Sequence, residues 1–355
     1  MADLLVYGSY GYTGSLVAQQ AVEEGLDPVL AGRDAEQVER QATELGCDHR
    51  TFSLRHPTVV EDQVAGFDVV LNCAGPFAET ADPMIEGCLT AGTDYLDLAG
   101  SIDVLESIAE RDRTAEKTGI VLLPAVGFDV VPMDCLAGFL HEELPSATNL
   151  TLALDGLGTF SPGTVKSIVR ELDRPGAVRV GGAIRPMPPA WRTRRIDFGQ
   201  GPKPAVTVPW GDVSTAYYTT GIPNIQTYAT VPPYAATAIR RGRRLFPLLG
   251  SGPVKRVLTA AADRFVSGPT AAERAGSVTR IRGEVEDDEG HSVAARMNTP
   301  DTYDVTARVA VAAARRVLVD DVSPGFQTPA SAFGPEFALE IEGIDREVVG
   351  PRATA

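Results

Sequence analysis

The sequence predicts an α/β fold that begins with a doubly wound parallel sheet, and three observations support this prediction. Residues 3–7 read as a short apolar strand that leads into the glycine-rich turn 8–14 and then into a helix. Strand and helix patterns alternate over roughly the first 125 residues, as in sheets with helices on both faces. Residues 67–72 form a near-continuous apolar run, which is typical of a strand buried on both sides. Together these features indicate a Rossmann fold.

The remaining elements follow from the same patterns. Further strands are expected at residues 28–31, 50–54, 68–72, 95–98 and 120–124, and helices over 15–24 and from near Ala35, Pro57, Ala81 and Ile102. A second region contains strand-like segments near 149–154, 193–198, 226–231 and 278–285, which predict a mostly antiparallel sheet. Residues 303–319 read as an alanine- and valine-rich helix that could pack back on the first region.

Three glycines in the first turn suit a dinucleotide. Gly8, Gly11 and Gly14 follow a buried strand and open a helix, and a second strand completes the β-α-β unit. Glycines permit a tight turn, a close approach of the backbone to a pyrophosphate, and an anion at the helix N-terminus. The spacing is GxxGxxG instead of the common GxGxxG, so a purely structural turn is the alternative. The candidate cofactor contacts are Gly8, Ser9, Tyr10, Gly11, Tyr12, Thr13 and Gly14.

The end of the second strand favours NADP(H) over NAD(H). An acidic residue there would bind the ribose hydroxyls of NAD, whereas this chain has Arg33, whose planar guanidinium suits a 2′-phosphate. In the alternative interpretation, Arg33 is an exposed loop charge. Asp34 could touch a ribose, or it could cap the next helix.

The fourth strand ends in a segment that we expect beside the glycine turn. Ligands of such sheets bind outside the carboxyl ends of the strands. The candidate cofactor contacts in this segment are Asn72, Ala74, Gly75, Pro76 and Phe77. Because Gly-Pro also marks ordinary loops, a simple strand-ending turn is the alternative.

Composition excludes several functional classes. A net charge of −15 argues against a nucleic-acid partner. The four cysteines lack CxxC spacing and the four histidines are dispersed, so neither a disulfide framework nor a metal site is expected. No apolar stretch is long enough for a membrane helix and no signal peptide is visible, so we expect a cytoplasmic protein. Arginine supplies 28 of the 32 basic residues, and this bias in an acidic chain raises salt adaptation as a hypothesis.

One segment runs against the acidic balance. Residues 240–256 flank the apolar run 245–249 with Arg240, Arg241, Arg243, Arg244, Lys255 and Arg256. Such a segment suits contact with a lipid or an acyl carrier, although solvated helix faces broken at Pro247 or Gly250 are the commoner explanation of a charge run. We expect a small-molecule, lipid-like substrate, peripheral membrane contact near this segment, and a homo-oligomer.

Motifs along nearly the whole chain resemble the saccharopine dehydrogenase-like NADP-binding family, especially its trans-acting enoyl reductases. The motifs are residues 7–14, 31–33, 72–77, 92–100, 127–134, 161–167 and 328–334. The segments Asn-Cys-Ala-Gly-Pro-Phe and Gly-Phe-Asp-Val-Val-Pro-Met-Asp are the most diagnostic. Pro162 stands where the family usually has a glycine, and Val130 where a serine is common, so the substrate pocket departs from the family pattern.

The resemblance implies a Rossmann sheet completed by returning C-terminal elements, with an inserted α+β domain that covers the nicotinamide. We therefore divide the chain into an NAD(P)-binding domain 1–128, an α+β substrate domain 129–300, and C-terminal helices 301–355 that pack on the first domain. The implied activity is NADP(H)-dependent reduction of an activated C=C or C=O bond in an apolar or acyl-linked substrate. Saccharopine-type chemistry at a C–N bond is an alternative, and a non-catalytic NADP sensor or scaffold is another.

Two residues are candidates for the proton transfer that accompanies hydride transfer. Asp129 follows the sixth strand, where substrate is expected, although an Asp ahead of a helix is more often a cap. Lys166 lies in a helix expected at 165–172, whose N-terminus could receive a carboxylate or thioester oxygen, although an exposed lysine is the commoner case. Tyr217 and Tyr218 are weaker candidates. The chain lacks a Tyr-x-x-x-Lys pair, a GxSxG elbow and a GxxxxGK[ST] loop.

Overall fold

The computed structural model describes residues 4–156, 158–232, 234, 241–242, 252–319 and 322–349. The chain forms two compact units, of which the first comprises Met1–Val131 and Tyr303–Gly334 and the second Pro132–Thr302 and Pro335–Ala355. We expected the whole segment 301–355 to accompany the first domain. Residues from Pro335 onward belong instead to the second unit, because the strand near the C-terminus pairs with that unit's sheet.

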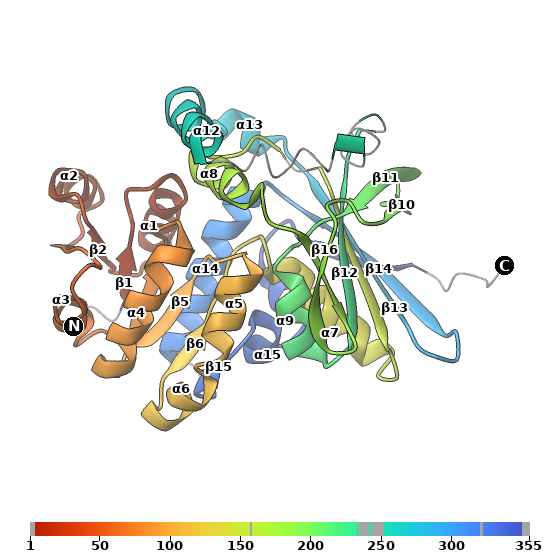
Figure 1. Cartoon of the computed structure of the whole chain (residues 1–355). Helices are drawn as coiled ribbons and strands as arrows, with labels where there is room; N and C mark the ends of the chain where they lie inside the picture. The colour runs from red at the N-terminus through yellow and green to blue at the C-terminus, as the bar shows by residue number, and fades with distance from the viewer. Residues whose placement is uncertain are drawn as a thin grey trace. The chain divides into compact units, whose positions relative to one another are not determined.

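The first unit contains a seven-stranded sheet in which every neighbouring pair is parallel. Its strands are β1 (Leu4–Tyr7), β2 (Val29–Gly32), β3 (His49–Thr51), β4 (Val69–Asn72), β5 (Asp94–Asp97), β6 (Val121–Leu123) and β15 (Gly325–Phe326) (Figure 1). They lie in the order β15-β6-β5-β4-β1-β2-β3, so the order reverses between β1 and β4. The predicted Rossmann-like sheet is confirmed, and the returning strand β15 extends it beside β6.

The helices of this unit connect the parallel strands. They are α1 (Tyr12–Glu23), α2 (Ala35–Leu45), α3 (Pro57–Val64), α4 (Phe77–Ala91), α5 (Ile102–Ala109), α6 (Asp112–Thr118), α14 (Thr302–Val319) and α15 (Pro329–Phe333). Helix α4 begins at Phe77, earlier than the expected start near Ala81, because Pro76 occupies its N-cap position. Helix α14 packs on α1, since the Tyr303 and Tyr12 rings meet edge to face at 5.0 Å and Arg315 pairs with Glu24 at 3.0 Å.

The second unit contains a nine-stranded sheet. Its strands are β7 (Asn149–Asp155), β8 (Gly176–Val180), β9 (Ala183–Met187), β10 (Thr193–Asp197), β11 (Pro202–Thr207), β12 (Asn224–Thr230), β13 (Thr279–Glu286), β14 (Ser292–Thr299) and β16 (Asp345–Val349). Among the described residues, its strand pairs are antiparallel except that of β7 with β12. The mostly antiparallel sheet expected for this region is therefore present.

The second unit also contains helices. They include α7 (Val131–Glu143), α8 (Pro162–Glu171), α9 (Asp212–Thr220), α12 (Gly252–Phe265) and α13 (Ala271–Ala275), followed by a short 3₁₀ turn at Phe337–Glu340. Leu136 and Leu140 of α7 press on Gly283 of β13, where a Cβ atom would come within 2.4 Å of Leu140. Among the described helices, none has the length and apolar character to cross a membrane. Most of the expected lipid-contact segment 240–256 lies outside the described residues.

Candidate functional site

The glycine turn after β1 is shaped so closely that side chains would not fit. Gly8 has a left-handed φ of 78°, and a Cβ atom on it would lie 2.7 Å from the Cβ of Ala74. A Cβ atom on Gly14 would lie 2.2 Å from the carbonyl oxygen of Gly8. The turn is held to β2 because the N–H groups of Gly8 and Ser9 both donate to the Ala31 carbonyl, at 2.7 and 3.2 Å.

The turn leads into the N-terminus of α1. Gly11 occupies the N-cap position and is exposed, and within the described residues this cap makes no side-chain hydrogen bond. The first N–H groups of a helix have no intrahelical acceptor and carry a partial positive charge. A backbone turn without side chains at such a terminus suits a phosphate group. The side chain of Ser9 is fully buried, so Ser9 would reach a ligand only through its backbone.

The end of β2 places Arg33 and Tyr10 beside each other. Gly32 leaves room for the Tyr10 ring, because a Cβ atom there would lie 2.4 Å from Tyr10 Cε1. Arg33 is exposed at the carboxyl end of the strand. Asp34 accepts hydrogen bonds from the Gln37 side-chain amide at 2.8 Å and from the Gln37 N–H at 3.2 Å. These two hydrogen bonds hold the pKa of Asp34 below its usual value. Asp34 therefore caps α2, as one of the two interpretations of this residue stated.

The segment after β4 forms a loop against the glycine turn. The Asn72 side chain is fully buried, donates to the Tyr95 hydroxyl at 3.2 Å and accepts from the Ala74 N–H at 3.0 Å. Thr80 donates to the Ala74 carbonyl at 2.6 Å. Asn72 thus shapes the loop from inside. The residues that reach the surface of this loop are Ala74, Gly75, Pro76 and Phe77, of which Gly75 is exposed and the others are half-buried. The peptide bond between Gly75 and Pro76 is cis.

Asp97 holds the loops after β5 and β6 together, although it was not among the predicted site residues. It is fully buried, accepts from the Ala99 and Ala125 N–H groups at 2.9 Å each, and accepts from the Tyr95 hydroxyl at 2.8 Å. Burial raises the pKa of Asp97, and these donors oppose the rise. Its position in the motif 92–100 was visible in the sequence, but its partners were not, because Ala125 lies 28 residues away.

Asp129 lies in the loop that follows β6. Its carboxylate is next to Gly100, where a Cβ atom would come within 3.2 Å of Asp129 Oδ2, and the preceding Phe128 N–H donates to Thr306 Oγ1 at 3.1 Å. The protein atoms packed around Asp129 raise its pKa to about 6, whereas the exposure of the same side chain to solvent limits this rise. A carboxyl group in this position can exchange a proton with a ligand near neutral pH.

Lys166 belongs to the second unit, on helix α8. Ser161 caps this helix by accepting from the Thr164 N–H at 3.2 Å, and Pro162 occupies the first turn. Lys166 is half-buried. Tyr217 and Tyr218 lie on α9 of the same unit, and the Arg179 guanidinium covers the Tyr217 ring at 4.2 Å from its centroid. The two candidate proton-transfer residues, Asp129 and Lys166, thus come from different units.

The comparisons with known proteins agree with this geometry. Residues 4–123 match the model of the saccharopine dehydrogenase NADP binding domain. Residues 4–123 are therefore similar to an NADP-binding domain of the saccharopine dehydrogenase family, and we refer to them as the NADP-binding domain. They contain β1 through β6, with the glycine turn, Arg33 and the loop after β4. The loop with Asp129 follows this domain directly.

Two curated relatives match part of the chain. A trans-acting enoyl reductase of Mycobacterium tuberculosis is 32% identical over an alignment of 140 residues that covers 37% of this chain and 34% of that protein. A saccharopine dehydrogenase-like oxidoreductase of Bos taurus is 29% identical over an alignment of 186 residues that covers 45% of this chain and 41% of that protein. The chain thus matches less than half the length of these curated relatives.

A solved structure shares the fold beyond the NADP-binding domain. Apo saccharopine dehydrogenase (L-Glu forming) from Saccharomyces cerevisiae superposes with a TM-score of 0.68 at 13% identity, over 99% of this chain and 100% of that chain. At this identity the likeness concerns the fold alone. It confirms the predicted combination of a Rossmann-like sheet with a second, mixed α/β region.

Proposed function

We propose that this protein is an NADP(H)-dependent oxidoreductase that reduces an activated C=C or C=O bond of an apolar, acyl-linked substrate. The observation that carries the proposal is the glycine turn, where Gly8 and Gly14 leave no space for a side chain and Gly11 opens a helix. This is a cradle for a pyrophosphate at a helix N-terminus. The loop after β4 adjoins it at the point where the strand order reverses, which is where such sheets bind nucleotides.

The preference for NADP(H) over NAD(H) rests on the end of β2. Arg33 is exposed there, and its guanidinium can form paired hydrogen bonds with a 2′-phosphate. The carboxylate next to it, Asp34, is engaged in capping α2 and accepts from Gln37. Asp34, which could otherwise bind the NAD ribose, is therefore hydrogen-bonded to the start of α2, whereas the exposed Arg33 guanidinium can bind a phosphate.

The residues around the strand ends support reduction. The bound cofactor would supply a hydride, and the reaction then needs one proton. Asp129 is suited to hold that proton, because its pKa is raised toward neutral pH and its side chain reaches solvent. Asp97 fixes the backbone on either side of this position through the Ala99 and Ala125 N–H groups. The choice of an enoyl group follows the name of the mycobacterial relative, and the carbonyl group is kept from the sequence-based hypothesis.

The cofactor part is tested by titrating wild-type protein with NADPH and NADH and following nicotinamide fluorescence. We expect Arg33→Ala to weaken NADPH binding by about tenfold to a hundredfold, the loss of a charged hydrogen-bond pair, and to leave NADH binding unchanged. Arg40→Ala is the matched control, since Arg40 is an exposed arginine on the neighbouring helix α2. Absence of binding of either nucleotide to the wild-type protein would overturn the proposal.

The reaction part is tested by cofactor consumption. Oxidation of NADPH by enone, enoyl-thioester and ketone probes should be detected with the wild-type protein and should fall strongly in Asp129→Asn. Consumption of NADP⁺ with amino-dicarboxylic substrates instead would indicate the C–N chemistry. Stoichiometric NADPH binding without turnover of any probe or cell extract would identify a sensor or scaffold.

A further inference from the structure

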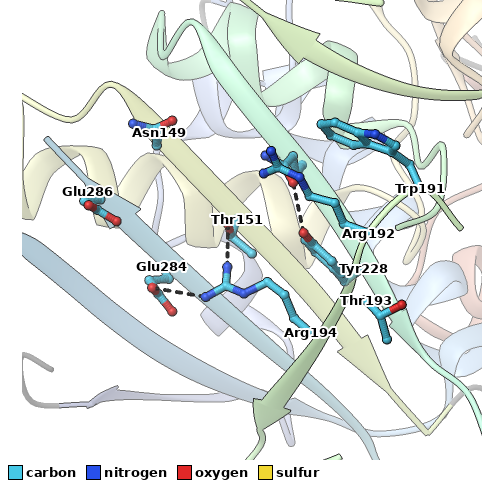
Figure 2. A pocket seen from close by; sticks show the side chains of 10 residues that line it. Asn149, Thr151, Trp191, Arg192, Thr193, Arg194, Tyr228, Glu284 and Glu286 are labelled. Atoms are coloured by element: carbon cyan, nitrogen blue, oxygen red, sulfur yellow. Dashed lines mark hydrogen bonds and ion pairs between the residues drawn. The ribbon is translucent and has the colours of Figure 1, made fainter. Parts of the chain in front are cut away.

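A polar pocket lies on the second sheet, within the second unit. It is a cavity of about 540 Å³ on the face opposite to α7, and Figure 2 shows its side chains pointing into one space. It is lined by Asn149, Thr151, Trp191, Arg192, Thr193, Arg194, Gln226, Tyr228, Glu284 and Glu286. None of these residues belongs to the NADP-binding domain, so the pocket is a separate feature of the molecule.

The pocket is built by three central strands and by one strand that crosses over them. Thr151 of β7 stands opposite Gln226 of β12 and Glu284 of β13, so their side chains share one face. Strand β10 is at the far edge of the sheet, yet its Arg194 reaches Thr151 at 3.2 Å and Glu284 at 3.5 Å. The sheet therefore curls, and β10 forms a wall above β7 and β13 (Figure 2).

The charges in the pocket are arranged at two ends with an ion-paired centre. In the centre, Arg194 and Arg282 both pair with Glu284, at 3.5 and 3.6 Å. At one end, the Arg192 guanidinium stacks on the Trp191 ring at 4.2 Å, and within the described residues it has no carboxylate partner. At the other end, the Glu286 carboxylate likewise has no cationic partner among the described residues. The pocket thus offers one unpaired cation and one unpaired anion to a ligand.

The two ends are well separated. Arg192 lies beside Tyr228, whose register partner on β7 is Ala153, whereas Glu286 stands opposite Asn149 on β7 (Figure 2). Four residues along a strand and two strand spacings correspond to about 16 Å between the Cα atoms of Tyr228 and Glu286. An extended chain of three residues spans about 10 Å, which is of the same order as this separation. A single amino acid is too short to bridge it.

We propose that this pocket binds an extended zwitterionic ligand with a peptide-like polar chain. Its carboxylate would pair with Arg192 and its ammonium group with Glu286. The Asn149, Thr151 and Gln226 side chains would form hydrogen bonds with the polar groups between the two ends. A ligand that carries both charges satisfies both ends of the pocket, whereas an anion or a cation alone satisfies one and faces a like charge at the other.

The probe for this site is triglycine with free termini, and the readout is the indole N–H signal of Trp191 in a nitrogen-15 correlation spectrum. The chain has two tryptophans, so Trp210→Phe assigns the signal. We expect a saturable shift with triglycine. N-acetyl-triglycine, triglycine amide and glycine should each bind at least about tenfold more weakly, because each loses one charged contact or cannot span the gap.

Variants of the two ends complete the test. Arg192→Gln and Glu286→Gln should each weaken triglycine binding by about tenfold, whereas Arg195→Gln should not, since Arg195 does not line the pocket. NADPH binding should be unchanged in all three variants, which separates this inference from the proposed function. Equal shifts with triglycine and its doubly blocked form, or no shift at all, would overturn the inference and identify a solvated sheet face.

Discussion

At the scale of single residues, the site depends on glycines at positions where a side chain would not fit. A Cβ atom on Gly8 would lie 2.7 Å from Ala74, and one on Gly14 would lie 2.2 Å from the Gly8 carbonyl oxygen. Gly32 similarly admits the Tyr10 ring next to Arg33. Asp97 and Asn72 then fix the loops after β4, β5 and β6 through buried hydrogen bonds. The polar residues that can meet a ligand are few, chiefly Arg33 and Asp129.

The raised pKa of Asp129 predicts a pH dependence. If Asp129 gives the proton in reduction, its protonated form is active, and that form is lost as pH rises through a pKa of at most about 6. We therefore expect kcat/KM for reduction to fall with increasing pH above this value. Asp129→Asn should abolish this limb of the profile along with most of the activity, measured by NADPH oxidation from acidic to neutral pH.

The control for this profile is Asp68→Asn. Asp68 is an exposed carboxylate that precedes β4, at the amino end of the strand, away from the edge that carries the glycine turn. It should leave the profile unchanged. A profile of Asp129→Asn with the same fall at increasing pH as the wild-type protein would show that another group delivers the proton.

At the scale of elements, the C-terminal strand β16 shows how a short segment is tied to a sheet. It pairs with β14, and Arg346 lies over the Phe139 ring of α7 at 3.6 Å from its centroid. The Arg346 side chain is 11% exposed and also pairs with Glu336. The Arg346 side chain therefore links β16 to α7 and to the turn that precedes the strand, and these contacts stabilise β16 within the second unit.

We expect Arg346→Ala to destabilise the protein by about 1–2 kcal/mol, the worth of a largely desolvated cation–π contact. Thermal unfolding should report this as a lowered Tm. Arg195→Ala is the matched control, because Arg195 is exposed on β10 and donates a hydrogen bond to the Pro202 carbonyl. The free energy of unfolding of this variant should stay within about 0.5 kcal/mol of the wild-type value. Equal losses in both variants would contradict the role given to Arg346.

At the scale of the whole molecule, the charge balance is the dominant feature. The net charge of −15 produces repulsion between like charges in the compact state, and salt screens it. We expect Tm to rise as KCl is increased to molar concentration. Near the isoelectric point of about 4.8 the same titration should have a smaller effect, because the net charge vanishes there. A Tm independent of KCl at neutral pH would argue against the hypothesis of salt adaptation.

The first unit could be predicted in order because its signals are local. Each parallel strand is a short apolar run, and the glycine turn marks the first crossover. Strands β8, β9, β11 and β14 were not predicted. In β9 and β11, prolines within Ala183–Met187 and Pro202–Thr207 mask the strand character. Strand β16 is mostly exposed and short, so its pairing with β14 had no signal in its own residues.

The sequence by itself determined the Rossmann-like sheet and supplied the candidate cofactor residues, since apolar periodicity and glycine spacing act over a few neighbouring residues. The role of Asp97, the unit to which the C-terminal strand belongs and the pocket between Arg192 and Glu286 were decided only by the tertiary structure. These features depend on contacts between residues far apart in the chain, such as Arg194 with Glu284. Strand pairing and sheet curl create those contacts, and neither is encoded in any single segment.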